Sequence, residues 1–120
     1  MRLAALALLW TCASLVRAEP SCTDAAADRQ ALEECARKEM LPLEAQVVSR
    51  FAALRAKYRS DPETRATLEK SQDAWNAYRN SHCAIEAKAR GAGSDIGAQR
   101  AFAACARREL ELRIKELESL

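Results

Sequence analysis

Four cysteines constrain the fold of this chain more than any other feature. Of the five cysteines in its 120 residues, Cys12 lies in an N-terminal apolar segment, and the others are Cys22, Cys35, Cys83 and Cys105. In an oxidising compartment, four cysteines predict two disulfides, each of which must bring two Cα atoms within about 4.4–6.8 Å. Two links of ~2–4 kcal/mol each would matter to a small domain with a modest core.

The N-terminal segment indicates export. It has Arg2 near its start, an apolar run over residues 3–9, and Val-Arg-Ala at residues 16–18 in the position of a cleavage box. This order is typical of a secretory signal peptide, so we predict that residues 1–18 are removed. The run is too short for a spanning helix, which needs about 20 apolar residues, and the Thr before Cys12 argues against lipid attachment. We therefore expect a periplasmic or secreted protein without membrane insertion.

Removal of residues 1–18 leaves a neutral chain. The Lys and Arg total falls from 19 to 17 because Arg2 and Arg17 lie in the removed segment, whereas all 17 Asp and Glu remain. A neutral chain with interspersed charges gives no electrostatic basis for binding nucleic acid or a membrane surface. Residues 19–120 are about the length of one domain, so we expect a single domain there.

The residue pattern of the mature chain predicts helices. It is rich in Ala, Glu, Arg and Leu, and no segment alternates with the period of two that a strand requires. A first helix should begin near Thr23 and Asp24 and contain a kink or short break near Pro42, because Pro lacks an amide donor and crowds the preceding turn. Its apolar positions recur every three to five residues: Leu32, Cys35, Met40, Leu43, Val47, Phe51, Leu54 and Tyr58.

Turn signals place two further helices. Asp61 can cap a second helix that starts with Pro62 and ends near Arg90, and a Ser or Asp in the turn 91–95 can cap a third helix. The second helix is expected to direct Leu68, Gln72, Trp75, Tyr78, Arg79, His82 and Ile85 inward. The third supplies Ile96, Phe102, Cys105, Leu110, Leu112, Ile114 and Leu117. Three amphipathic helices joined by short turns predict an all-α fold, an antiparallel three-helix bundle stapled by two disulfides.

The spacing of the cysteines favours one pairing. Cys83 and Cys105 lie at matching distances on either side of the turn 91–95, so an antiparallel hairpin would bring them to the same level. Cys22 is then left with Cys35, although a continuous helix would hold them ~20 Å apart. The segment before Cys35 must therefore fold back or begin its helix later. A crossed pairing of Cys22 with a downstream cysteine stays open.

The sequence predicts no metal site, no cofactor and no catalytic site. Zinc is the alternative use for four thiols and His82, but no Cys-x-x-Cys pair is present and export favours disulfides. Ser81 and His82 are adjacent on a helix and point about 100° apart, so they do not form a nucleophile and its base. There is no Gly-x-Ser-x-Gly elbow, phosphate-binding glycine loop or His-x-x-x-His pair. We therefore predict a protein that is not an enzyme.

Two aromatic residues stand one turn apart in the second predicted helix. Trp75 and Tyr78 could form a stacking platform for a sugar or a base, but a chain with so few aromatics more often uses them in its core. Arg79 follows Trp75 by four residues, so its guanidinium can lie over the indole ring or pair with a carboxylate. We interpret this stretch as framework.

The same stretch resembles a known family. Its order fits L-x3-Q-x2-W-x2-[FY]-R-x3-C, a signature that resembles that of the LprI-like lysozyme inhibitor family, and the similarity runs from Cys22 to about Leu117. The resemblance implies a small exported bacterial domain that binds a protein, a lysozyme, and blocks its substrate cleft. It also implies that the framework of this domain is Leu68, Gln72, Trp75, Tyr78, Arg79, Arg113 and the cysteines.

Two surfaces are candidates for contact with a basic enzyme such as lysozyme. One is the turn from Gly91 to Gly97, and the other is the acidic stretch Asp61-Pro62-Glu63. The alternative function is a periplasmic structural or adaptor module that has no lysozyme partner.

Overall fold

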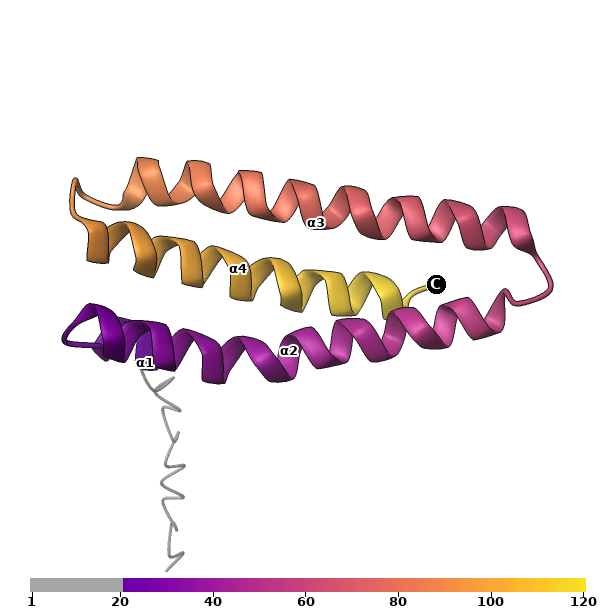
Figure 1. Ribbon diagram of the computed structural model, residues 1–120, viewed down its shortest axis with the longest axis horizontal. Helices are drawn as coiled ribbons and strands as arrows, with labels where there is room; N and C mark the ends of the chain where they lie inside the picture. The colour runs from indigo at the N-terminus through magenta and orange to yellow at the C-terminus, as the bar shows by residue number, and fades with distance from the viewer. Residues whose placement is uncertain (1–20) are drawn as a thin grey trace, which may run out of the picture.

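The computed structural model of the chain describes residues 21–120, and the predicted signal peptide lies outside these residues. The described part consists of α1 (Cys22–Ala25), α2 (Arg29–Lys57), α3 (Pro62–Arg90) and α4 (Asp95–Glu118), and it contains no strand (Figure 1). The prediction of an all-helical chain is thus confirmed for residues 21–120. None of these helices is long and apolar enough to cross a membrane.

Each long helix begins at a side chain that caps its first turn. The caps are Asp28, Asp61 and Ser94, whose side-chain oxygens accept hydrogen bonds from backbone N–H groups three residues later at 2.9, 3.0 and 3.1 Å. These bonds satisfy amide donors that have no partner inside the helix. Pro62 occupies the first helical position after Asp61, where its missing N–H costs nothing. The predicted starts of α3 and α4 are confirmed.

The prediction of one helix starting near Thr23 is wrong. α1 is a single turn, and α2 starts only after Asp28 caps a new helix. The break lets the chain fold back, so that the Cα atoms of Cys22 and Cys35 lie 5.8 Å apart. Thr23 and Ala26 are buried in this corner, which shows that the returned segment packs on the helices. The expectation that the segment before Cys35 folds back is therefore correct.

Pro42 does not break α2. The helix runs unbroken from Arg29 to Lys57, and Figure 1 shows a gentle change of direction near its middle. Pro42 lies on the exposed side of α2, whereas Val47 and Leu54 on its other side are buried. We attribute the continuity of α2 to this burial, which outweighs the one backbone hydrogen bond that proline removes.

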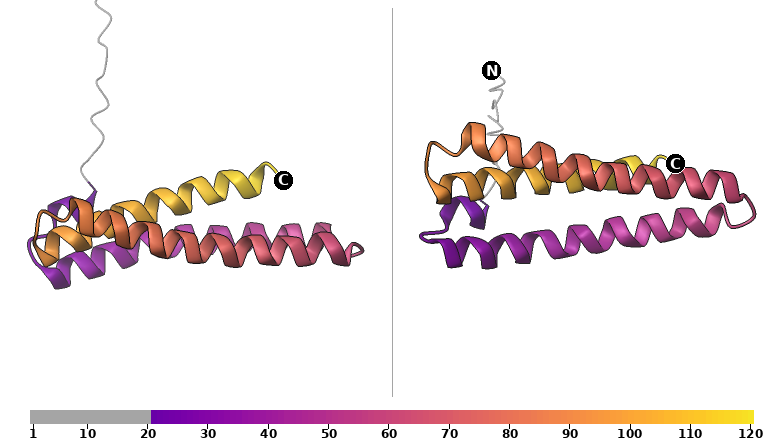
Figure 2. Two further views of the ribbon diagram at one scale, coloured as in Figure 1. Left: turned by 90° about the horizontal axis from the view of Figure 1, so that it is seen from above. Right: turned by 45° about the horizontal axis from the view of Figure 1, so that its top comes forward.

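The three long helices lie side by side with α4 between the other two (Figure 1). α4 packs against both α2 and α3, whereas α2 and α3 make little contact with each other. α2 and α4 run in the same direction and α3 runs opposite to both. Seen from above in Figure 2, the C-terminal half of α4 rises out of the layer that α2 and α3 form. The helices thus alternate in direction, but their packing is centred on α4, and the predicted three-helix bundle is not confirmed in this detail.

A hydrophobic core cluster joins the C-terminal half of α4 to α2 and α3. Its buried members are Val47, Leu54, Leu68, Leu110, Ile114 and Leu117, with Phe51 and Trp75 partly buried beside them. Among the largest fully buried side chains are Leu110 in this cluster and Leu32 near the start of α2. The apolar surface removed from water here is the main stabilising contribution to the fold.

Four side chains that the sequence pattern directed inward are exposed. Tyr78 is 54% exposed and Ile85 is 68% exposed, and Phe102 and Leu112 on α4 also reach solvent. For Tyr78 and Ile85 the reason is that α3 packs mainly on α4, so only one narrow stripe of α3 is covered. A helix with two neighbours would bury a wider stripe.

Candidate functional site

Each of the two disulfides joins cysteines that are consecutive in the sequence, which is the pairing that the sequence favoured. Cys83 and Cys105 join α3 to α4 with their Cα atoms 5.4 Å apart, and Cys22 joins Cys35. The crossed pairing is therefore excluded. The two links differ in environment: Cys83 and Cys105 are fully buried, whereas Cys22 is exposed.

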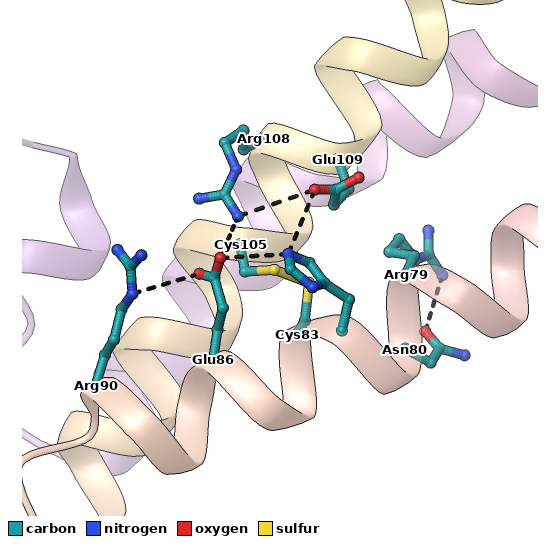
Figure 3. The surroundings of a disulfide bond; sticks show 9 residues. Arg79, Asn80, Cys83, Glu86, Arg90, Cys105, Arg108 and Glu109 are labelled. Atoms are coloured by element: carbon teal, nitrogen blue, oxygen red, sulfur yellow. Dashed lines mark hydrogen bonds and ion pairs between the residues drawn. A yellow bond between two sulfur atoms is a disulfide. The ribbon is translucent and has the colours of Figure 1, made fainter.

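A charged cluster covers the buried disulfide on the α3–α4 seam (Figure 3). Glu86 lies at its centre and accepts a hydrogen bond from Arg108 at 2.8 Å. His82 Nε2 lies 3.3 Å from the same Glu86 oxygen and 4.0 Å from an oxygen of Glu109, and Arg90 Nε lies 4.0 Å from the other Glu86 oxygen. Because Glu86 is on α3 and Arg108 is on α4, this cluster holds the two helices together next to the disulfide.

The cysteine beside this cluster is not available as a metal ligand. His82, Cys105 and Glu109 approach one another, but the Cys105 sulfur is bonded to Cys83 and is not a thiolate ligand. The same holds for Cys22 and Cys35 beside Glu39 at the other disulfide. The Ser81 hydroxyl donates to the carbonyl of Ala77 at 2.9 Å, so it is turned to its own helix rather than to His82.

A second polar cluster crosses the same seam nearer the core. Gln72 Oε1 accepts hydrogen bonds from Arg113 Nε at 3.1 Å and Nη2 at 3.0 Å, and Arg113 is 6% exposed. The Trp75 ring lies 4.9 Å from the Arg79 guanidinium and 5.5 Å from that of Arg113. Three residues of the motif, Gln72, Trp75 and Arg79, thus meet Arg113 of α4 in one place. This arrangement can stabilise the α3–α4 contact through charge-assisted hydrogen bonds and cation–π contacts.

Apart from Cys83, the remaining motif residues, Leu68 and Tyr78, lie elsewhere. Leu68 is buried in the core cluster one turn from Gln72. Tyr78 lies outside the Gln72–Arg113 cluster and stacks on His82, with ring centroids 5.2 Å apart. No local sequence signal indicates the pairing of Gln72 with Arg113, because the two residues are far apart in the chain.

The structure also contains a groove that the sequence did not predict. It has a volume of about 480 Å³ and lies where α2, α3 and α4 face one another. The apolar side chains that line it are Leu32, Ala36, Met40, Leu41, Phe102, Ala103, Ala106 and Leu110. Charged and polar groups, among them Arg37, Glu44 and Arg79, stand around these side chains. A groove of this size and character can hold an apolar ligand or part of a protein partner.

The turn between α3 and α4 is closely packed at its base and exposed at its tip. A Cβ at Gly91 would lie 2.6 Å from the carbonyl oxygen of Ala87 and 2.8 Å from the backbone of Ala98, so only glycine fits. Ala92 and Gly93 have φ angles of 51° and 72° and are exposed. The sharp turn therefore projects from a rigid base.

In the acidic stretch at the start of α3, one carboxylate already forms hydrogen bonds within the helix. Asp61 accepts from the Thr64 hydroxyl at 2.6 Å and from the Thr64 N–H at 3.0 Å. The Thr64 hydroxyl and backbone hydrogen bonds lower the pKa of Asp61 because they stabilise the ionised carboxylate. The other carboxylate in this stretch, Glu63, takes no part in these hydrogen bonds.

A family model described as Lysozyme inhibitor LprI matches residues 22–117, which include α1, α2 and α3 and nearly all of α4. The chain belongs to the LprI lysozyme inhibitor family. No curated protein and no solved structure matches the chain significantly.

Membership of the LprI family agrees with the resemblance drawn from the central motif. It is an inhibitor family, so membership implies a protein partner, a lysozyme. The family and the two disulfides are together consistent with an extracytoplasmic protein.

Proposed function

We propose that the mature protein is an exported inhibitor that binds a lysozyme and blocks its substrate cleft without catalysing a reaction. The observation that carries the proposal is the family match, which covers α1, α2, α3 and nearly all of α4. The two disulfides support action in the periplasm or outside the cell, because such links persist in oxidising compartments.

The α3–α4 turn is the contact element that the geometry supports best. Ala92 and Gly93 form a narrow exposed tip at one end of the molecule (Figure 1). The base of the turn is held by the close backbone approach at Gly91 and, along the two helices, by the Cys83–Cys105 disulfide. A preordered projection loses little conformational entropy when it enters a cleft, which favours tight binding.

The stretch from Asp61 to Glu63 is a weaker candidate. Because Asp61 caps α3 through Thr64, recruiting its carboxylate to a partner would remove two hydrogen bonds from the helix start. The α2–α3 turn, which directly precedes this stretch, therefore serves as the control site in the experiment below.

The experiment compares one insertion at two turns. Inserting Ser-Gly-Ser between Ala92 and Gly93 should raise the half-inhibitory concentration against the sensitive lysozyme by at least about tenfold, a loss of about 1.4 kcal/mol of binding. The same insertion between Arg59 and Ser60, in the α2–α3 turn, should leave inhibition unchanged. Circular dichroism should show the same helix content in both variants.

Two results would contradict the proposal at different levels. Unchanged inhibition after the insertion at Ala92 would reject the α3–α4 turn as the contact element. Failure of the oxidised wild-type protein to inhibit any lysozyme type would reject the function itself, and the structural or adaptor role in the envelope would replace it.

A further inference from the structure

α2 carries exposed apolar side chains on its outer side, at the edge of the groove. Leu41 is 52% exposed and Val48 is 67% exposed, and their spacing of seven residues puts them on one face of the helix. Leu41 also lines the groove, together with the exposed ring of Phe102. Within residues 21–120 no segment covers these side chains, so they form an unpartnered apolar stripe.

Two opposite charges lie along the same face of α2. Arg37 and Glu44 stand four residues before and three residues after Leu41, and both line the groove. Among the described residues neither forms an ion pair. Arg37 lies near Glu34, but the Glu34 carboxylate pairs with Lys38 at 2.9 Å. The stripe is therefore flanked by one cation and one anion that are both available to a partner.

We propose that this face of α2 binds a second copy of the chain. The two α2 helices would run antiparallel about a two-fold axis that passes near Met40 and Leu41. Arg37 and Glu44 then lie at equal distances from the axis, about 5 Å along the helix, on opposite sides. Each Arg37 faces the Glu44 of the other copy, and the two Leu41 side chains meet at the axis beside the grooves.

The charge pattern is what favours a copy of the same chain over an unrelated protein. In a two-fold interface residue i contacts residue j and j contacts i, so the surface must be complementary to itself. Arg37 and Glu44 lie symmetrically about the apolar centre at Leu41, so a two-fold dimer would form two Arg37–Glu44 ion pairs, one on each side of the axis. The interface uses no residue of the α3–α4 turn, so the dimer and the proposed inhibition of lysozyme can be tested separately.

Charge reversal tests this pairing directly. In sedimentation velocity of the purified, oxidised mature protein, the wild type should shift from monomer to dimer as its concentration rises. Arg37→Glu and Glu44→Arg should each weaken the dimer by at least about tenfold, because two attractive contacts become repulsive. An equimolar mixture of the two single variants should dimerise again, since the carboxylate introduced in one variant then meets the guanidinium introduced in the other. The double variant R37E/E44R should also dimerise.

Controls separate this interface from a general effect of charge. Glu111→Arg, at an exposed position of α4, should leave the dimer unchanged, and Leu41→Ser should weaken it without lowering the helix content. A wild type that stays monomeric at its highest soluble concentration would overturn the proposal. Single reversals without effect, or a mixture that does not restore the dimer, would overturn it equally.

Discussion

The two disulfides differ in what surrounds them, and this contrast separates the rigid part of the molecule from an attachment at its edge. Cys83–Cys105 is fully buried between two long helices, with the charged cluster of Glu86 and Arg108 beside it. Cys22–Cys35 holds a one-turn helix whose first cysteine is exposed. We therefore regard the α3–α4 hairpin as the framework of the domain and α1 as a short segment that a disulfide attaches to α2.

Loop length does not account for this contrast. The disulfides span sequence separations of 13 and 22 residues. In the chain-entropy model, loops of these lengths stabilise the fold by amounts that differ by less than about 0.5 kcal/mol. A larger difference must come from the native environments of the two links.

Removing each disulfide in turn should give the largest effect. The variant C83A/C105A should lose about 4 kcal/mol of unfolding free energy, because the unfolded chain gains entropy and a buried cavity is left. C22A/C35A should lose only about 1–2 kcal/mol, since α1 can detach and recover part of the entropy in the native state. Urea denaturation monitored by circular dichroism measures both values. Equal losses would remove the distinction between framework and attachment.

The Gln72–Arg113 pair should give the next largest effect, within the framework itself. Gln72→Ala leaves the buried Arg113 guanidinium without its main acceptor and should cost about 2–3 kcal/mol. Glu116 also bonds Arg113, at 3.0 Å, but its side chain is 60% exposed. Glu116→Ala should therefore cost less than about 0.5 kcal/mol. Similar losses of unfolding free energy for the two variants would show that burial does not determine how much a hydrogen bond to Arg113 stabilises the fold.

The smallest effect is expected at the N-terminus of α3, where Asp61 caps the helix. The pKa of Asp61 is lowered by its hydrogen bonds to Thr64, so the folded state holds this proton less tightly than the unfolded state. The stabilisation is fully present above the ordinary Asp pKa of about 3.9 and is lost as pH falls through the lower pKa of the folded state. The difference in Tm between the wild type and Asp61→Ala should thus shrink on acidification. A difference that stayed constant from neutral pH to about pH 2 would contradict this role for the carboxylate.

Local signals in the sequence were sufficient for much of the fold. The caps at Asp61 and Ser94 act within one helical turn, and the positions of Cys83 and Cys105 follow from a simple hairpin. The break before Arg29 was missed because Thr23 and Asp24 offer the same capping chemistry as Asp28, and only packing of the returned segment decides between them.

Features that depend on the neighbours of a helix could not be predicted. The periodicity of α3 marks Tyr78 and Ile85 as inner residues, but their exposure follows from the central position of α4. The groove and the Gln72–Arg113 pair join residues that are distant in sequence, so no local pattern reveals them.

The most direct test of the proposed inhibition is a lysozyme titration with the oxidised wild type and C22A/C35A side by side, against several lysozyme types acting on bacterial cell walls. We predict dose-dependent inhibition of at least one type, with equal potency for the two proteins, because we place the proposed inhibitory surface on the α3–α4 hairpin. Absence of inhibition by the wild type, or its loss in C22A/C35A while the helix content is retained, would contradict this assignment.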